Sequence, residues 1–115
     1  EETIRGIGTQ FSATNNPAEA VTGASVVYTD VWASMGQEEE REKRLADFEG
    51  YTVGDELFEL SNDDSIFMHC LPAHPGEEVS RSVLDNGKSR IWEQAENRMH
   101  AARGFLLHLF QEENQ

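Results

Sequence analysis

The chain has 115 residues, 22 of them acidic and 9 basic, so its formal net charge is −13. Because nucleic-acid binding depends on a basic surface, this balance disfavours nucleic acid as a partner. A single cysteine excludes an internal disulfide and suits a reducing, cytoplasmic setting, and no apolar run approaches the roughly 18 residues that span a bilayer.

Short elements of alternating type follow one another along the first half of the chain. In order, the patterns predict a strand at 9–14, a helix at 17–21, a strand at 25–29, a surface helix at 37–49, an extended piece at 51–53 and a helix at 55–60. Pro17 suits a first helical position, and Gly23 suits a helix end. The β-branched pair Val26-Val27 is typical of a core strand.

The second half continues the alternation and ends in the longest predicted helix. The patterns predict a core strand at 65–68, a helix or helical turn at 77–84, a short strand at 89–92 and a long helix at 93–110. In the helix predicted at 93–110, apolar residues recur at four-three-four-three spacing from Ala95 to Leu109. Strands alternating with helices predict an α/β fold, here a partial doubly wound parallel sheet flanked by helices, with a long C-terminal helix.

His69-Cys70-Leu71-Pro72 places the only cysteine in a turn directly after the predicted strand at 65–68. Pro72 ends that strand because proline has no backbone N–H for a ladder. In an open parallel sheet, ligands bind beyond the carboxyl ends of the strands, and the loop at 30–36 leaves the other core strand at the same edge. We therefore expect the Asp30 carboxylate, the Cys70 thiol and the Arg98 guanidinium to share one crevice.

Each of these residues also has an ordinary structural interpretation. A lone cysteine such as Cys70 is more often an inert, buried thiol. Asp30 fits a turn or helix cap, and Arg98 fits a surface ion pair of little energetic weight. His69, Cys70 and His74 could form a metal cluster, but their spacing is poor for a closed four-ligand site, so the sequence predicts no metal.

Four short motifs resemble the ornithine carbamoyltransferase family, in the right order and at suitable intervals. They are Thr29-Asp30-Val31-Trp32, Ser34-Met35-Gly36-Gln37, His69-Cys70-Leu71-Pro72 and Glu96-Asn97-Arg98. The resemblance implies an enzyme that transfers the carbamoyl group of carbamoyl phosphate to the δ-amine of ornithine, giving citrulline and phosphate without a cofactor. It further implies arginine biosynthesis or the arginine deiminase pathway, a cytoplasmic location, and a homotrimer or trimer-based assembly.

The resemblance also implies a role for each residue at the ornithine end of the site. Asp30 lies by the δ-amino group and orients it. Cys70 contacts the same end, as a positioning group or as a proton acceptor, and is the predicted catalytic residue. Ser34 and Met35 meet the α-amino and α-carboxylate groups.

At the carbamoyl end, the resemblance assigns backbone groups of Cys70 and Leu71 to the carbamoyl amide. Arg98 is assigned to oxygen atoms, where it would stabilise charge that develops on the carbonyl oxygen. A carboxylate beside a thiol also keeps the thiol from acidifying, so we expect Asp30 to prevent the pKa of Cys70 from falling.

By the same resemblance, residues 1–92 are an N-terminally truncated ornithine-binding α/β domain. Residues 93–115 are a C-terminal helix that packs back toward a missing carbamoyl-phosphate domain. The chain begins with Glu1 and lacks the family's Ser-Thr-Arg-Thr-Arg and His-Pro-x-Gln motifs, so we expect a piece of a longer protein that is inactive alone. Two alternatives stay open: a related carbamoyltransferase that uses another amine, and a non-catalytic amino-acid-binding fragment.

Overall fold

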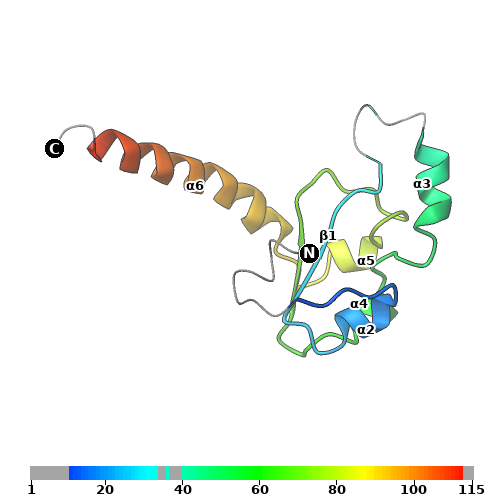
Figure 1. The fold of residues 1–115 in the computed structure, drawn as a ribbon. Coiled ribbons are helices and arrows are strands. Elements are labelled where there is room, and N and C mark those ends of the chain that lie inside the picture. The colour runs from blue at the N-terminus through cyan, green and yellow to red at the C-terminus, as the bar shows by residue number, and fades with distance from the viewer. Residues whose placement is uncertain (1–10, 34–35, 37–39, 113–115) are drawn as a thin grey trace.

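The computed structural model describes residues 11–33, 36 and 40–112. In chain order, its elements are α2 (Pro17–Val21), β1 (Val26–Thr29), α3 (Arg41–Asp47), α4 (Asp55–Phe58), β2 (Ile66–His69), α5 (Arg81–Leu84) and α6 (Ile91–Glu112). Figure 1 shows α2, α4 and α5 gathered around the strands, with α3 at one side and α6 extending away from the body. The predicted α/β class with a long C-terminal helix is confirmed.

β1 and β2 form a parallel pair at the centre of the body. The register places Val27 opposite Phe67 and Thr29 opposite His69. Parallel strands need a long crossover connection, and α3 and α4 lie in the chain between these two. Both strands therefore end at one edge of the sheet, and the loops that follow them leave from that edge.

The predicted strand at 89–92 is wrong. Ser89 forms only an isolated parallel bridge to Phe67, and Arg90 donates its N–H to the Phe67 carbonyl at 2.9 Å. The chain then turns into α6, because the N–H of Gln94 already bonds the Arg90 carbonyl. Ile91 is buried as the first residue of this helix, so packing overrides its preference for a strand.

The predicted strand at 9–14 is wrong in its described part. Residues 11–14 are irregular, and they pair with no strand in the described part of the chain. A strand needs a partner for its backbone N–H and C=O groups, so weak alternation alone does not form one. Residues 9 and 10 lie outside the described residues.

The predicted helices are confirmed, although most are shorter than their patterns. α2 begins as expected, because the Asn16 side chain accepts the N–H groups of Ala18 and Glu19 at 3.1 and 3.4 Å. Gly23 follows the helix in a left-handed conformation, with φ 71°. α3, α4 and α5 have 7, 4 and 4 residues, and turns follow α3 and α4 and precede α5 where helix was predicted. Residues 37–39 of the predicted helix at 37–49 lie outside the described residues.

The core is made of apolar side chains from the sheet, α2, α4, α5 and the start of α6, together with the isolated bridge between Val53 and Val79. Its members are Val21, Val27, Val53, Phe58, Phe67, Val79, Val83, Leu84 and Ile91. Phe58 meets Phe67 edge to face at 6.1 Å between ring centroids, a favourable aromatic geometry. This core fixes β2, and with it the turn that carries Cys70.

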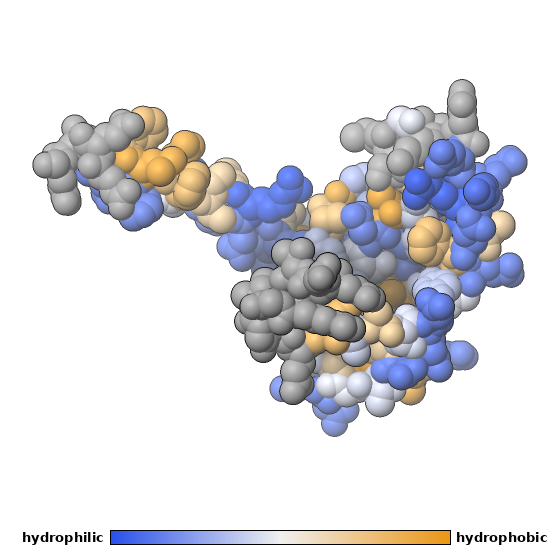
Figure 2. Space-filling view, in the orientation of Figure 1, coloured by the Kyte–Doolittle hydropathy of each residue, from blue (hydrophilic) through white to orange (hydrophobic). Residues whose placement is uncertain are grey.

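α6 presents apolar side chains to solvent in its first turn, at Trp92, and again from Met99 onward. Its exposed large apolar residues are Trp92, Met99, Phe105, Leu106, Leu107, Leu109 and Phe110, called here the α6 apolar strip. Figure 2 shows apolar side chains gathered toward the outer end of this helix. Within the described part of the chain, no helix combines the length and the apolar composition of a membrane-spanning segment.

Candidate functional site

Asp30 and Cys70 face each other beyond the carboxyl ends of β1 and β2. Because Thr29 pairs with His69 in the sheet, the next residue of each strand emerges at the same edge. The Cys70 Sγ donates a hydrogen bond to Asp30 Oδ1 at 2.9 Å, across 40 residues of sequence. The predicted meeting of carboxylate and thiol is confirmed.

This contact shifts both pKa values in opposite directions. The hydrogen bond from the Cys70 thiol lowers the pKa of Asp30, and the hydrogen bond from the N–H of Val31 adds to that effect, while burial opposes it. The same hydrogen bond, together with burial, raises the pKa of the Cys70 thiol. Asp30 is therefore an ionised acceptor, and Cys70 is a protonated donor rather than a ready covalent nucleophile.

Replacing Asp30 with asparagine is expected to make Cys70 several-fold more reactive toward iodoacetamide near pH 8. The carboxylate is the main cause of the raised thiol pKa, so its removal lets the thiol ionise at lower pH, and only the thiolate reacts. Alkylation rates measured across pH check this, and the label is unambiguous because the chain has one cysteine. A variant whose rate profile stays unchanged would show that Asp30 does not control the thiol.

The buried His69 supports the turn that begins at Cys70. Its Nδ1 accepts the N–H of Leu71 at 2.8 Å. Because a backbone N–H can only donate, the proton of the neutral ring lies on Nε2, which donates to Glu78 Oε1 at 3.1 Å. Leu71 has φ 59°, a left-handed conformation that costs a leucine roughly 1–2 kcal/mol. The bond to His69 helps to hold it there.

Glu78 closes the other end of the same turn. Its side chain is fully buried, and its Oε1 also accepts the N–H of His74 at 2.6 Å. Glu78 Oε1 therefore links His69, which precedes Cys70, to His74 at the end of the turn. The sequence alone does not predict this role of His69 and Glu78, since no spacing distinguishes Glu78 from its neighbour Glu77.

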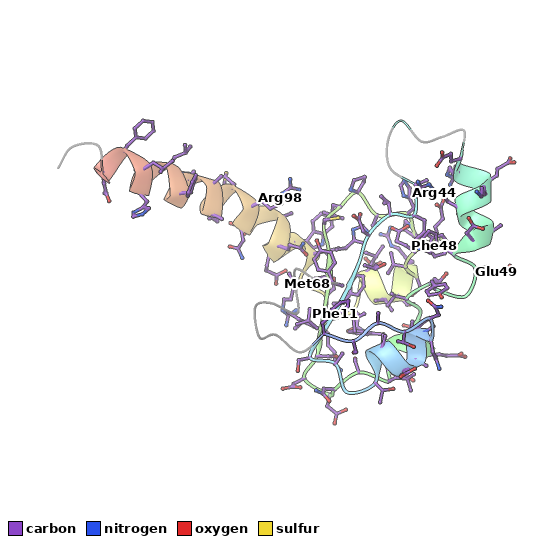
Figure 3. All side chains as sticks on the ribbon, in the orientation of Figure 1. Phe11, Arg44, Phe48, Glu49, Met68 and Arg98 are labelled. Atoms are coloured by element: carbon purple, nitrogen blue, oxygen red, sulfur yellow. The ribbon has the colours of Figure 1, made fainter. Side chains whose placement is uncertain are left out.

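The start of α6 is bonded to the ends of both strands through Gln94. The N–H of His69 donates to Gln94 Oε1 at 3.1 Å, and Gln94 Nε2 donates to the Tyr28 hydroxyl at 3.1 Å. Arg98 lies one turn further along, on the same helix face as Gln94. Figure 3 shows it on the part of α6 that adjoins the body.

The Arg98 side chain is exposed. The ordinary alternative, an ion pair on its own helix, is not formed, because no residue in the described ranges pairs with Arg98 and Glu96 bonds His100 instead. Among the described residues, Arg98 makes no hydrogen bond or ion pair with Asp30 or Cys70, so the expected grouping of the three is confirmed only for Asp30 and Cys70. Ser34 and Met35 lie outside the described residues.

A pocket of about 420 Å³ adjoins Asp30. Its lining residues are Tyr28, Thr29, Asp30, Val31, Trp32, Arg44, Phe48 and Tyr51. Trp32 stacks on Phe48 with 5.8 Å between the ring centroids, and Phe48 meets Tyr51 edge to face with 6.1 Å between the centroids. Arg44, labelled with Phe48 in Figure 3, donates to the Trp32 carbonyl at 3.4 Å. Asp30 thus lies beside a cluster of three aromatic side chains that no pattern in the sequence predicts.

The chain matches the family model described as aspartate/ornithine carbamoyltransferase, Asp/Orn binding domain, over residues 1–109. It is 53% identical over 100 residues to an ornithine carbamoyltransferase of Caldicellulosiruptor saccharolyticus, covering 87% of this chain and 32% of the relative. A catabolic ornithine carbamoyltransferase of Halobacterium salinarum is 53% identical over 95 residues, which cover 83% of this chain and 32% of that relative. The solved ornithine carbamoyltransferase of Pyrococcus furiosus superposes with a TM-score of 0.81 at 47% identity, covering 92% of this chain and 34% of that one. The chain spans about a third of the length of the curated relatives it matches.

Proposed function

The chain belongs to the aspartate/ornithine carbamoyltransferase family, and we propose that it supplies the ornithine-binding half of an ornithine carbamoyltransferase site. In the reaction, the δ-nitrogen of ornithine bonds the carbonyl carbon of carbamoyl phosphate and loses a proton. The carbon–oxygen bond to phosphate breaks, so the products are citrulline and phosphate. The observation that carries this proposal is the contact between the Asp30 carboxylate and the Cys70 thiol at the strand ends.

The ornithine end of the site needs a group that holds a cation and then orients a neutral amine. An alkyl ammonium has a pKa near 10 and no lone pair with which to attack. Asp30 suits this task because its pKa is lowered and it stays ionised. The aromatic pocket beside it suits the methylene chain of ornithine. The protonated Cys70 would position both the carboxylate and the amine.

At the carbamoyl end, Leu71 and Arg98 have separate roles. The Leu71 N–H donates to His69, so the Leu71 carbonyl, together with backbone groups of Cys70, is proposed to bind the carbamoyl NH₂. Arg98 would donate to the carbonyl oxygen and stabilise the charge that develops there, as oxyanion-stabilising groups do. Ser34 and Met35 are proposed, from the family resemblance, to bind the α-amino and α-carboxylate groups.

We further propose that residues 93–115 pack against a carbamoyl-phosphate-binding domain, and that residues 1–92 form the ornithine-binding domain. The α6 apolar strip supports this arrangement, since contiguous exposed apolar surface usually marks an interface. A cytoplasmic, trimer-based enzyme would fit the same proposal.

We expect the protein that carries this chain to carbamoylate ornithine at least about 10²-fold faster than putrescine. Putrescine lacks the α-amino and α-carboxylate groups, and a site built for such polar groups rejects analogues without them. An assay of ureido product from carbamoyl phosphate and either amine checks this. Preference for putrescine would favour a related carbamoyltransferase that uses another amine. Binding of ornithine without transfer would favour the non-catalytic alternative.

A further inference from the structure

We propose that His74, Glu77 and Glu78 form a binding site for one first-row divalent metal ion of the Zn²⁺ class, on the turn that follows Cys70. One donor atom from each of these side chains lies within 4.8 Å of the other two. His74 Nδ1 and Glu78 Oε2 are 3.9 Å apart. Two donors that bind one Zn²⁺ at about 2.1 Å in tetrahedral geometry are about 3.4 Å apart. A small side-chain movement would therefore bring them to coordination distance.

The buried Glu78 carboxylate gives an independent indication of a ligand. Its Oε1 accepts two hydrogen bonds, from His69 Nε2 and from the N–H of His74. Its Oε2 is equally buried, accepts no hydrogen bond from any described residue, and faces His74 Nδ1. A buried carboxylate oxygen without a donor is costly, and a cation beside it would remove that cost.

The three donors differ in burial in a way that leaves the ion a path from solvent. The side chains of His74 and Glu77 are 46% and 18% exposed, whereas that of Glu78 is 0% exposed. One imidazole with two carboxylates suits zinc or its first-row neighbours better than magnesium or calcium, which favour oxygen ligands alone. Three protein ligands also leave a coordination position open to solvent.

The cluster considered from the sequence, His69 with Cys70 and His74, is a different set of atoms. Both ring nitrogens of His69 are engaged, by Leu71 and Glu78. The Cys70 Sγ faces Asp30. Of that earlier set, only His74 contributes a donor to the site proposed here.

Arg41 makes an ion pair with Glu77 and so competes with a metal ion for the same carboxylate. A bound ion must share or displace this guanidinium. Removal of Arg41 is therefore expected to strengthen the binding of Zn²⁺.

Isothermal titration of the chain with Zn²⁺, and with Mg²⁺ in parallel, tests the site. We expect one Zn²⁺ per chain, bound at least tenfold more tightly than Mg²⁺. His74→Ala and Glu77→Gln should each weaken Zn²⁺ binding at least tenfold, and neither alters a fully buried side chain, so folding is retained and checked by circular dichroism. Arg41→Ala should tighten binding. Unchanged affinity in all three variants would overturn the proposal.

Two control variants test other side chains that could bind Zn²⁺. Cys70→Ser removes the only thiol, and His100→Ala removes an exposed histidine paired with Glu96 at 3.3 Å. Both should keep the stoichiometry and affinity for Zn²⁺. Loss of binding in either control, or no saturable binding at all, would overturn the proposal. These results do not depend on carbamoyl transfer, so they stand apart from the test of the proposed function.

Discussion

Replacing His69 with alanine is expected to lower the free energy of unfolding by about 3–5 kcal/mol, because one partner of a buried charged network is lost. The ring is fully buried. Without it, the Glu78 carboxylate loses a donor and the Leu71 N–H loses its acceptor, and a cavity remains. Urea denaturation followed by far-ultraviolet circular dichroism measures the change.

Two further variants separate the halves of this network. His69→Gln can keep a donor for Glu78, while His69→Asn can keep an acceptor near the Leu71 N–H. Hydrogen bonds to charged groups contribute about 1.5–3 kcal/mol and neutral ones about 0.5–1.5 kcal/mol, so glutamine should recover more stability than asparagine.

The matched control for this series is His100→Ala, which removes an exposed histidine that also pairs with a glutamate. Its effect should stay within about 0.5 kcal/mol. If His69→Ala costs no more than this control, the buried pair does not stabilise the turn around Cys70.

The fold was predictable wherever local pattern and tertiary packing agree. Val26 and Val27 have strand propensity and pair with Ile66 and Phe67 in β2, so the core strands follow from sequence. Ile91 has the same propensity, but it is buried at the start of α6 after a single bridge at Ser89. The single bridge at Ser89 and the four paired residues of β1 cannot be told apart from local sequence, because the length of a strand depends on the segment that lies beside it.

The meeting of Asp30 and Cys70 was predictable because it follows from topology alone. Parallel strands end at one edge, so the residues after them must be neighbours. The support of that turn was not predictable, since Glu77 reaches Arg41 near the surface while Glu78 is fully buried. Two adjacent glutamates look alike in sequence, and only side-chain packing decides which one is buried.

Replacing Asp30 with asparagine should reduce kcat/KM for ornithine by about 10²–10³-fold, within the range that positioned proton-transfer or charge-pairing groups contribute. Asparagine matches the size of aspartate and keeps an oxygen for the Cys70 thiol, but it cannot pair with the δ-ammonium. The predicted loss of kcat/KM therefore comes from removing the negative charge that pairs with the δ-ammonium of ornithine. Steady-state citrulline formation at varied ornithine, in the protein that carries this chain, measures it.

Asp85→Asn is the matched control for that loss, because Asp85 is an exposed carboxylate paired with Arg81 at 2.8 Å, on α5 and its cap. It should leave kcat/KM unchanged. Cys70→Ser keeps a hydroxyl that can donate to Asp30, so a positioning role predicts a smaller loss, of about tenfold, with the pH profile unchanged. A shifted profile would instead make the thiol a proton acceptor. Full activity in Asp30→Asn would refute the role of Asp30, and with it the contact on which the proposed half-site depends.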